Sequence, residues 1–363
     1  MYKKMIQHQI FFDFLRFSIG SESEIPDSLI EADWKELYRI AQKQCLVGIL
    51  FDGIQRLPSS NVGISRDLLL QWMAQSKMLE KANVQLNDAA ILVSEWFRKK
   101  GFRTCILKGQ GNALLYPNPY SRTPGDIDIW VEGGDKRVIS FVRSISPHEK
   151  ACYHHIEFPS YKGVEVEVHY RPSFLLCFWH NRKLQKYYER VKEEQFSPRV
   201  MLGEQGEIAI PTVEFNLIFQ LTHIYAHLMN EGIGLRQLLD YYFVLQHADI
   251  KDLTELQRNL KHFGLWKFAG AIMYIMHEVF GMPASRLIVP LNEKYGNFVL
   301  NEVLEAGNFG SYDKRNRFGK SQLGHNLQRV YRDIRLIKYF PAEALSEPIF
   351  RVWHFFWRMK NKK

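Results

Sequence analysis

The sequence predicts an α+β protein in which a small α/β unit is inserted into a mainly helical chain. From the N-terminus to about residue 100, apolar residues recur at helical spacing, beginning with Ile6, Ile10 and Phe14. From residue 102 to 170, β-branched runs and period-two alternation replace that spacing. Helical spacing then returns. We therefore divide the chain into an N-terminal helical region (1–80), an α/β core (81–171) and a C-terminal helical domain (172–363).

The α/β unit is preceded by a long helix and continues as short elements. Apolar spacing predicts a helix from about Arg66 to Lys100, with Gly101 at its C-terminal cap. The following segments are predicted as strand 102–107, a short helix after Gly109, strand 126–132, helix 136–145 and a hairpin with arms 154–160 and 164–170. From about Pro172 to the end the pattern is helical, with helices near 213–230, 234–247, 251–262 and 266–280.

Composition and charge narrow the class of protein. A chain of 363 residues with 46% apolar and 24% charged residues can bury a full core and is neither disordered nor fibrous. The four cysteines stand apart without a CxxC pair, which argues against a disulfide framework or zinc knuckle and for a reducing compartment. The first residues lack an export cleavage site, and no run of ~18 apolar residues occurs, so we expect a cytoplasmic protein without a transmembrane segment.

Most of the basic excess lies in the tail. The net charge of +9 favours an anionic partner, and residues 301–363 carry 13 Lys and Arg against 6 Asp and Glu, interleaved with aromatic residues such as Trp353, Phe355 and Phe356. Two interpretations are open. The first is an amphipathic helix whose aromatic side packs on the body and whose basic side is solvated. The second is a peripheral surface for nucleic acid or anionic lipid.

A glycine-containing turn follows the first predicted strand. The strand ends at Leu107, and Lys108-Gly109-Gln110-Gly111 leads into the short helix. Gly109 and Gly111 allow the backbone to approach a ligand closely, and the first N–H groups of a helix favour an anion. This pattern indicates a phosphate-binding turn.

Acidic residues recur on the two strands that follow. Asp126 and Asp128 are two residues apart in a strand, so their carboxylates share a face and can converge on a hard cation. A later strand offers Glu165, Glu167 and His169 on one face, and we place Glu167 in the same site. Two acids beside a phosphate-binding turn are what metal-assisted nucleotidyl transfer requires.

These motifs together resemble the nucleotidyltransferases of the DNA polymerase β-like superfamily. Lys108-Gly109, Tyr116-Pro117, the Asp126-Ile127-Asp128 strand and the Glu167-Val168-His169 strand are most similar to a family of uncharacterised bacterial nucleotidyltransferases. The similarity covers about residues 80–171 and extends loosely through 223–227 and 234–240. It implies a small mixed-sheet core of the polymerase β-like type.

The resemblance also implies roles for single residues. Asp126 and Asp128 match the metal-binding pair, Glu167 matches the third carboxylate, and Gly109 matches the turn that holds the triphosphate. The chain departs from the family pattern at Gln110, where Ser or Gly is usual, and at Glu167, where Asp is more frequent. The first departure could alter phosphate contacts, and the second could shift the metal geometry.

Basic side chains and histidines are further candidates. Lys108 and Arg122 are placed to meet phosphate oxygens, and Arg122 is favoured because its planar fork can bind phosphate bidentately. His223 and His227 lie on one helical face and could bind a metal, pack in the core, or help to recognise a base or acceptor together with Arg236 and Asp240. The neighbouring His154 and His155 are predicted on opposite faces of a strand, so they should not serve one centre.

The sequence therefore predicts a nucleotidyltransferase that uses Mg²⁺, or Mn²⁺, and an NTP as co-substrate. Asp126, Asp128 and Glu167 would hold the ions, and Glu167 or Glu165 could accept the proton of the acceptor hydroxyl. The acceptor stays open among tRNA or another polyanion, a protein and a small molecule. The alternative, motivated by Gln110, is an inactive nucleotide- or nucleic-acid-binding module of the same fold.

Overall fold

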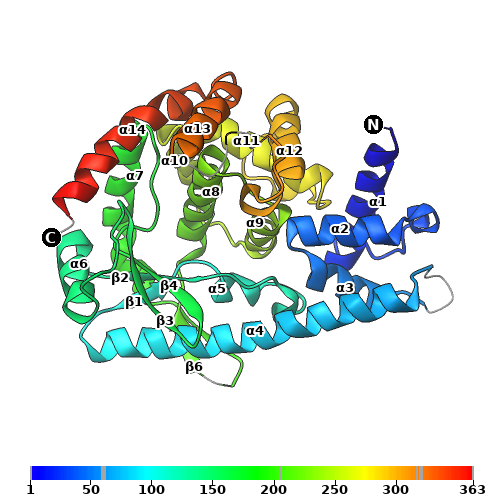
Figure 1. Cartoon of the computed structure of the whole chain (residues 1–363), viewed down its shortest axis with the longest axis horizontal. Coiled ribbons are helices and arrows are strands. Elements are labelled where there is room, and N and C mark those ends of the chain that lie inside the picture. The colour runs from blue at the N-terminus through cyan, green and yellow to red at the C-terminus, as the bar shows by residue number, and fades with distance from the viewer. Residues whose placement is uncertain (1, 59–62, 205, 316–317, 319–321, 362–363) are drawn as a thin grey trace.

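The computed structural model describes residues 2–58, 63–204, 206–315, 318 and 322–361. Its N-terminal region is helical, as predicted, and ends in one long helix that runs beneath the rest of the molecule (Figure 1). The helices of this region are α1 (Tyr2–Ile19), α2 (Trp34–Gln44), α3 (Val47–Arg56) and α4 (Arg66–Lys99), with a 3-10 turn at Asp27–Glu31. Ser65 caps α4 through Leu68 N, and Gly101 follows its end with a positive φ of +81°.

The α/β core contains a four-stranded mixed sheet, which confirms the predicted fold class. The strands are β1 (Thr104–Ile106), β2 (Ile127–Val131), β3 (His155–Tyr161) and β4 (Val164–His169), in the order β1-β2-β4-β3. β2 pairs with β4 in parallel, whereas β1 and β3 each pair antiparallel with their neighbours. The helices α5 (Gln110–Ala113) and α6 (Gly134–Ile145) connect the strands, with a 3-10 turn at Pro119–Ser121.

The central strand β2 is buried on both faces, and successive side chains point to opposite faces of the sheet. Ile127 and Ile129 pack in a cluster with Phe97 of α4 and Val142 of α6. Asp128 and Trp130 point to the opposite face, where Trp130 stacks on Phe215 of the C-terminal domain. Asp128 is therefore carried into the boundary between the sheet and the C-terminal helices.

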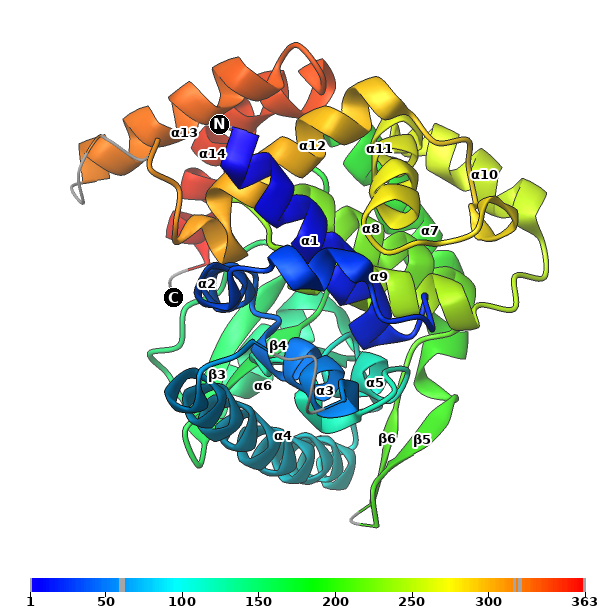
Figure 2. The ribbon, with the colours of Figure 1, turned by 90° about the vertical axis from the view of Figure 1, so that its right-hand side faces the viewer.

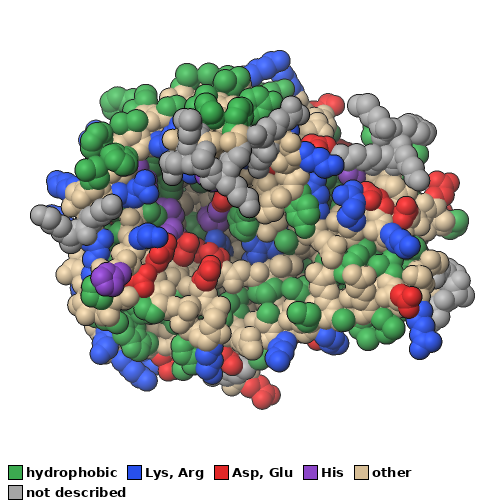
Figure 3. Space-filling view, viewed as in Figure 1, with side chains coloured by type: hydrophobic (Ala, Val, Ile, Leu, Met, Phe, Trp, Pro, Cys, Tyr) green, Lys and Arg blue, Asp and Glu red, His purple; other side chains and the backbone are tan. Residues whose placement is uncertain are grey.

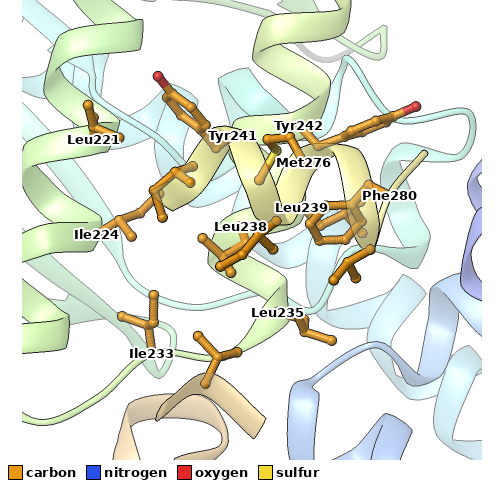
Figure 4. Packing of buried hydrophobic residues seen from close by; sticks show 14 of the residues in the cluster. Leu221, Ile224, Ile233, Leu235, Leu238, Leu239, Tyr241, Tyr242, Met276 and Phe280 are labelled. Carbon is orange, nitrogen blue, oxygen red and sulfur yellow. The ribbon is translucent and has the colours of Figure 1, made fainter. Parts of the chain in front are cut away.

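The C-terminal domain is helical except at one hairpin. Its elements are α7 (Phe178–Val191), β5 (Arg199–Leu202), β6 (Gly206–Ala209), α8 (Val213–Asn230), α9 (Leu235–His247), α10 (Leu253–His262), α11 (Trp266–Glu278), α12 (Glu293–Ala306), α13 (Gln322–Leu336) and α14 (Pro341–Lys360). Short 3-10 turns lie at Lys192–Phe196, Ala284–Arg286 and Asn308–Gly310. The helices α8, α9 and α11 enclose apolar residues that include Leu221, Leu239 and Met276 (Figure 4).

The hairpin β5–β6 corrects the prediction that the chain is helical throughout after Pro172. Its two strands have four residues each and project from the body (Figure 2). Gly203 has a φ of +59° at the turn, and only Leu202, Ile208 and Ala209 among the strand residues are buried. Strands this short give too few alternating positions to reveal their period. None of the described helices combines the length and apolar character needed to cross a membrane.

Candidate active site

The turn after β1 is built as the sequence predicts. Leu107 N donates to Asp128 O at 3.0 Å, which ties the end of β1 to β2. The chain then reverses at Gly109, whose φ of +60° and ψ of −111° suit glycine and strain any other residue. Space is not the constraint, because the nearest atom to a Cβ at Gly109 would be Asp126 O at 3.8 Å.

Gln110 anchors this turn to the core. Its side chain is buried, and its Nε2 donates to Asn87 Oδ1 of α4. The residue that departs from the family pattern at this position is thus a structural side chain that ties the turn to α4.

The structure brings the three predicted acids together. One carboxylate oxygen from each of Asp126, Asp128 and Glu167 lies within 4.8 Å of the others. The cause is the parallel register of β2 and β4, which sets Asp128 opposite Glu167. Glu165 lies before the part of β4 that pairs with β2 and is exposed, so it is outside this cluster.

Two cations already compensate Asp128. Lys108 Nζ lies 2.9 Å from Asp128 Oδ2 and 4.0 Å from Asp126 Oδ1. His169 Nε2 lies 2.9 Å from Asp128 Oδ1 and 3.4 Å from Glu167 Oε2. Burial alone would raise the pKa of Asp128, but Lys108 and His169 outweigh it and hold that pKa well below its ordinary value.

The pKa shifts of His169 and Asp126 indicate that negative charge is in excess in this cluster. Burial opposes the charged form of His169, yet its bonds to Asp128 and Glu167 raise its pKa to about 9. Repulsion from Asp128 raises the pKa of Asp126. Apart from the ion pair with Lys108, the buried Asp128 Oδ2 has no hydrogen-bond partner among the described residues. A hard cation with oxygen ligands fits this set of three carboxylates.

Histidines of α8 close the site from the opposite side. His223 Nε2 lies 3.0 Å from Lys108 Nζ and 3.0 Å from His227 Nε2, and His227 Nδ1 lies 2.5 Å from Glu231 Oε1. Burial and the charge of Lys108 lower the pKa of His223 well below its usual value. The acids and both histidines line one cavity of about 290 Å³. Figure 3 shows acidic and histidine side chains gathered at the hollow over this region.

His154 and His155 lie in the same cavity, contrary to the prediction that they face apart. His154 Nε2 is 3.1 Å from His155 Nδ1, and His155 Nδ1 is 3.2 Å from Glu167 Oε2. The prediction was wrong because β3 begins at His155, so strand alternation does not extend to His154. The sequence gives no sign of where that strand begins.

Arg122 lies beside the Gly109 turn, as predicted, but it already has an anionic partner. It is 3% exposed, and its Nε and Nη2 each donate at 2.7 Å to the two carboxylate oxygens of Asp240. Tyr116 Oη also donates to Asp240, at 2.7 Å. Two of the guanidinium nitrogens of Arg122 are thereby engaged in a buried ion pair, while the residue also lines a second cavity together with Lys108 and Gly109.

Arg236 is the better placed guanidinium. It is 8% exposed and lines the same cavity together with Lys108, Gly109 and Asp126. Its Nη1 donates to Thr123 O at 3.0 Å, whereas its buried Nε has no hydrogen-bond partner within the part of the chain that the structure describes. Residues far apart in sequence meet here, so sequence spacing could nominate Arg236 but could not rank it above Arg122.

Comparison with known proteins places this site in a family. Residues 31–281 match the model of a family described as uncharacterised nucleotidyltransferase. No curated protein matches the chain. An antigenic nucleotidyltransferase-like protein from Paracoccidioides brasiliensis is a similar solved structure, with 15% identity and a TM-score of 0.31 over 57% of this chain and 94% of that one. Because the family match spans most of the chain, the protein belongs to the uncharacterised nucleotidyltransferase family.

Proposed function

We propose that the protein is an Mg²⁺-dependent nucleotidyltransferase that moves an NMP from an NTP to an acceptor hydroxyl. The observation that carries this proposal is the convergence of Asp126, Asp128 and Glu167 beside the Gly109 turn. Mg²⁺ would be held by these three carboxylates, with Mn²⁺ as the alternative. The ion supplies charge neutralisation for the phosphates and lowers the pKa of a bound hydroxyl.

The residues of the chain would orient the reaction around that centre. The Gly109 turn, Lys108 and Arg236 line one cavity and are placed to hold the triphosphate. A new bond forms between the acceptor oxygen and the α-phosphorus while the bond to pyrophosphate breaks. Glu167, which is partly exposed, is placed to accept the acceptor proton, whereas the exposed Glu165 is not.

Calorimetric titration with each of the four NTPs, with and without Mg²⁺, tests the donor site. We expect at least one NTP to bind with Mg²⁺ present and to bind much more weakly after chelation, because three carboxylates repel a polyphosphate when no cation bridges them. If no NTP binds under either condition, the proposed function fails, and the inactive binding module becomes the better description.

Arg236→Gln is expected to weaken NTP binding by about tenfold or more, since a charge-assisted contact to phosphate is lost. Arg199→Gln removes a guanidinium from β5, outside both cavities, and serves as the matched control. The measurement is the same titration in the presence of Mg²⁺. Equal affinities of the Arg236→Gln variant and the wild type would remove Arg236 from the phosphate site.

A further inference from the structure

The outer face of α14 is an apolar stripe. Its members follow one another at spacings of three or four residues, which places them on one side of a helix. They are between 54% and 63% exposed and comprise Leu345, Ile349, Val352, Phe356 and Met359. The inner face of α14 is packed independently, because Phe350 is 5% exposed and contacts Tyr153 and Phe174. More than half of the surface of each stripe residue is therefore left outside the packing of α14 on the body.

The neighbouring helix continues this surface. α13 packs against α14, and Leu327, Val330 and Ile334 recur at spacings of three and four residues with exposures of 43% to 65%. Ile337, directly after α13, extends the row. Figure 3 shows apolar side chains gathered along the upper edge of the molecule, where α13 and α14 lie in Figure 1. Contiguous exposed apolar surface of this kind marks an interaction site.

This arrangement corrects the expectation of an aromatic inner side and a basic outer side. Phe350 does pack inward, but Phe355 and Phe356 are 52% and 62% exposed. α14 is apolar on both faces because its outward positions also fall on Leu345, Ile349 and Val352. The sequence pattern shows one apolar period but cannot show which of two apolar faces meets the core.

The acidic and basic side chains of α13 and α14 differ in their burial. All carboxylates within residues 324–361 are buried, namely those of Asp333, Glu343 and Glu347, at 8%, 2% and 3% exposure. Glu343 accepts from Leu176 N at 2.6 Å, and Glu347 pairs with Arg351 at 2.9 Å. The exposed charges in the same range are cationic and belong to Arg329, Lys338, Arg358 and Lys360. The exposed charges that residues 324–361 contribute are thus all cationic, and we call these four residues the basic border.

We propose that the α13–α14 face binds an anionic lipid surface. The apolar stripes would enter the boundary between headgroups and acyl chains, and the basic border would contact lipid phosphates. A second copy of the chain is a poorer occupant, because apposing two such faces brings cationic borders together. An acidic protein partner would match the border but leaves the length of the apolar stripe unexplained.

Vesicle flotation with the full chain tests this proposal. The probe is vesicles of phosphatidylcholine with phosphatidylglycerol, compared with vesicles of phosphatidylcholine alone. We expect binding to the anionic vesicles, weaker binding to the neutral ones, and loss on raising the salt concentration. Two double variants, Ile349→Glu/Phe356→Glu and Arg358→Glu/Lys360→Glu, should each lower the bound fraction by about tenfold or more.

The control is the double variant Ile30→Glu/Met78→Glu. It introduces the same charge at apolar side chains that are 89% and 72% exposed and lie outside α13 and α14. It should bind like the wild type, and all variants should keep the thermal midpoint because each site is exposed. The proposal is overturned if the wild type binds neither kind of vesicle, or if Ile349→Glu/Phe356→Glu binds as the wild type does. Sedimentation that shows a dimer broken by this variant, without vesicle binding, would assign the face to a second copy.

Discussion

Asp126→Asn is expected to lower the rate of nucleotidyl transfer by about three orders of magnitude, which corresponds to about 4 kcal/mol of transition-state stabilisation. Asp126 is one of three carboxylates that converge within 4.8 Å, so its loss removes a ligand and a negative charge from the proposed metal centre. The measurement is pyrophosphate release from the NTP that binds, with the acceptor identified by transfer of the α-phosphate label.

The same substitution should leave stability unchanged or slightly raised. The Asp126 side chain is 34% exposed and precedes β2, and repulsion by Asp128 raises the pKa of Asp126. Removing a repelled charge relieves the folded state, whereas a purely structural residue would lose stability on replacement. An unchanged thermal midpoint together with lost turnover is therefore the signature of a catalytic role.

A matched pair of substitutions on β4 distinguishes loss of the three-carboxylate cluster from a general effect of removing charge. Glu167→Gln should reproduce the loss of turnover, and Glu165→Gln, two residues earlier on the same strand, should not. Both changes remove one negative charge from β4. If Glu165→Gln were as inactive as Glu167→Gln, or Asp126→Asn kept full turnover, the three-carboxylate centre would be the wrong assignment.

The strand positions of the acidic site residues could be predicted because they depend on the local residue pattern. Polar and apolar residues alternate through Asp126–Ile129 and Val164–His169, and each strand forms close to where that alternation occurs. The resemblance implied that the acids share one site, and the structure brings them together through the parallel pairing of β2 and β4. Long helices such as α4 and α8 were likewise predicted closely, since many turns repeat one apolar period.

The side-chain partners that the sequence could not predict depend on contacts between segments that are distant in the chain. Nothing near Arg122 shows that its partner is Asp240, 118 positions away, so a free fork and a paired fork look alike in sequence. The contact of Lys108 with His223 spans 115 positions and is equally hidden. The contacts of side chains at such junctions are determined by how the sheet packs against the C-terminal helices. Local periodicity does not encode this packing.

Arg122→Ala is expected to cost about 3–5 kcal/mol of folding free energy, because it leaves Asp240 ionised and buried at 5% exposure. Burial alone would raise the pKa of Asp240, yet Arg122 keeps it below the ordinary 3.8. The stabilisation is therefore present at neutral pH and is lost as the pH falls through the lowered pKa of the folded state. Chemical denaturation at neutral pH measures the loss.

The double variant Arg122→Met/Asp240→Leu shows whether the cost arises from the unpaired charge. Replacing both partners by apolar residues of similar size removes the desolvated pair, so the double variant should be more stable than Arg122→Ala alone. Arg236→Gln, in the same cavity but without a carboxylate partner at hydrogen-bond distance, should lose NTP affinity with a smaller loss of stability. The opposite result, in which Arg122→Ala unfolds like the wild type but binds NTP weakly, would return Arg122 to the phosphate site. The two arginines are thus told apart by which quantity each substitution changes.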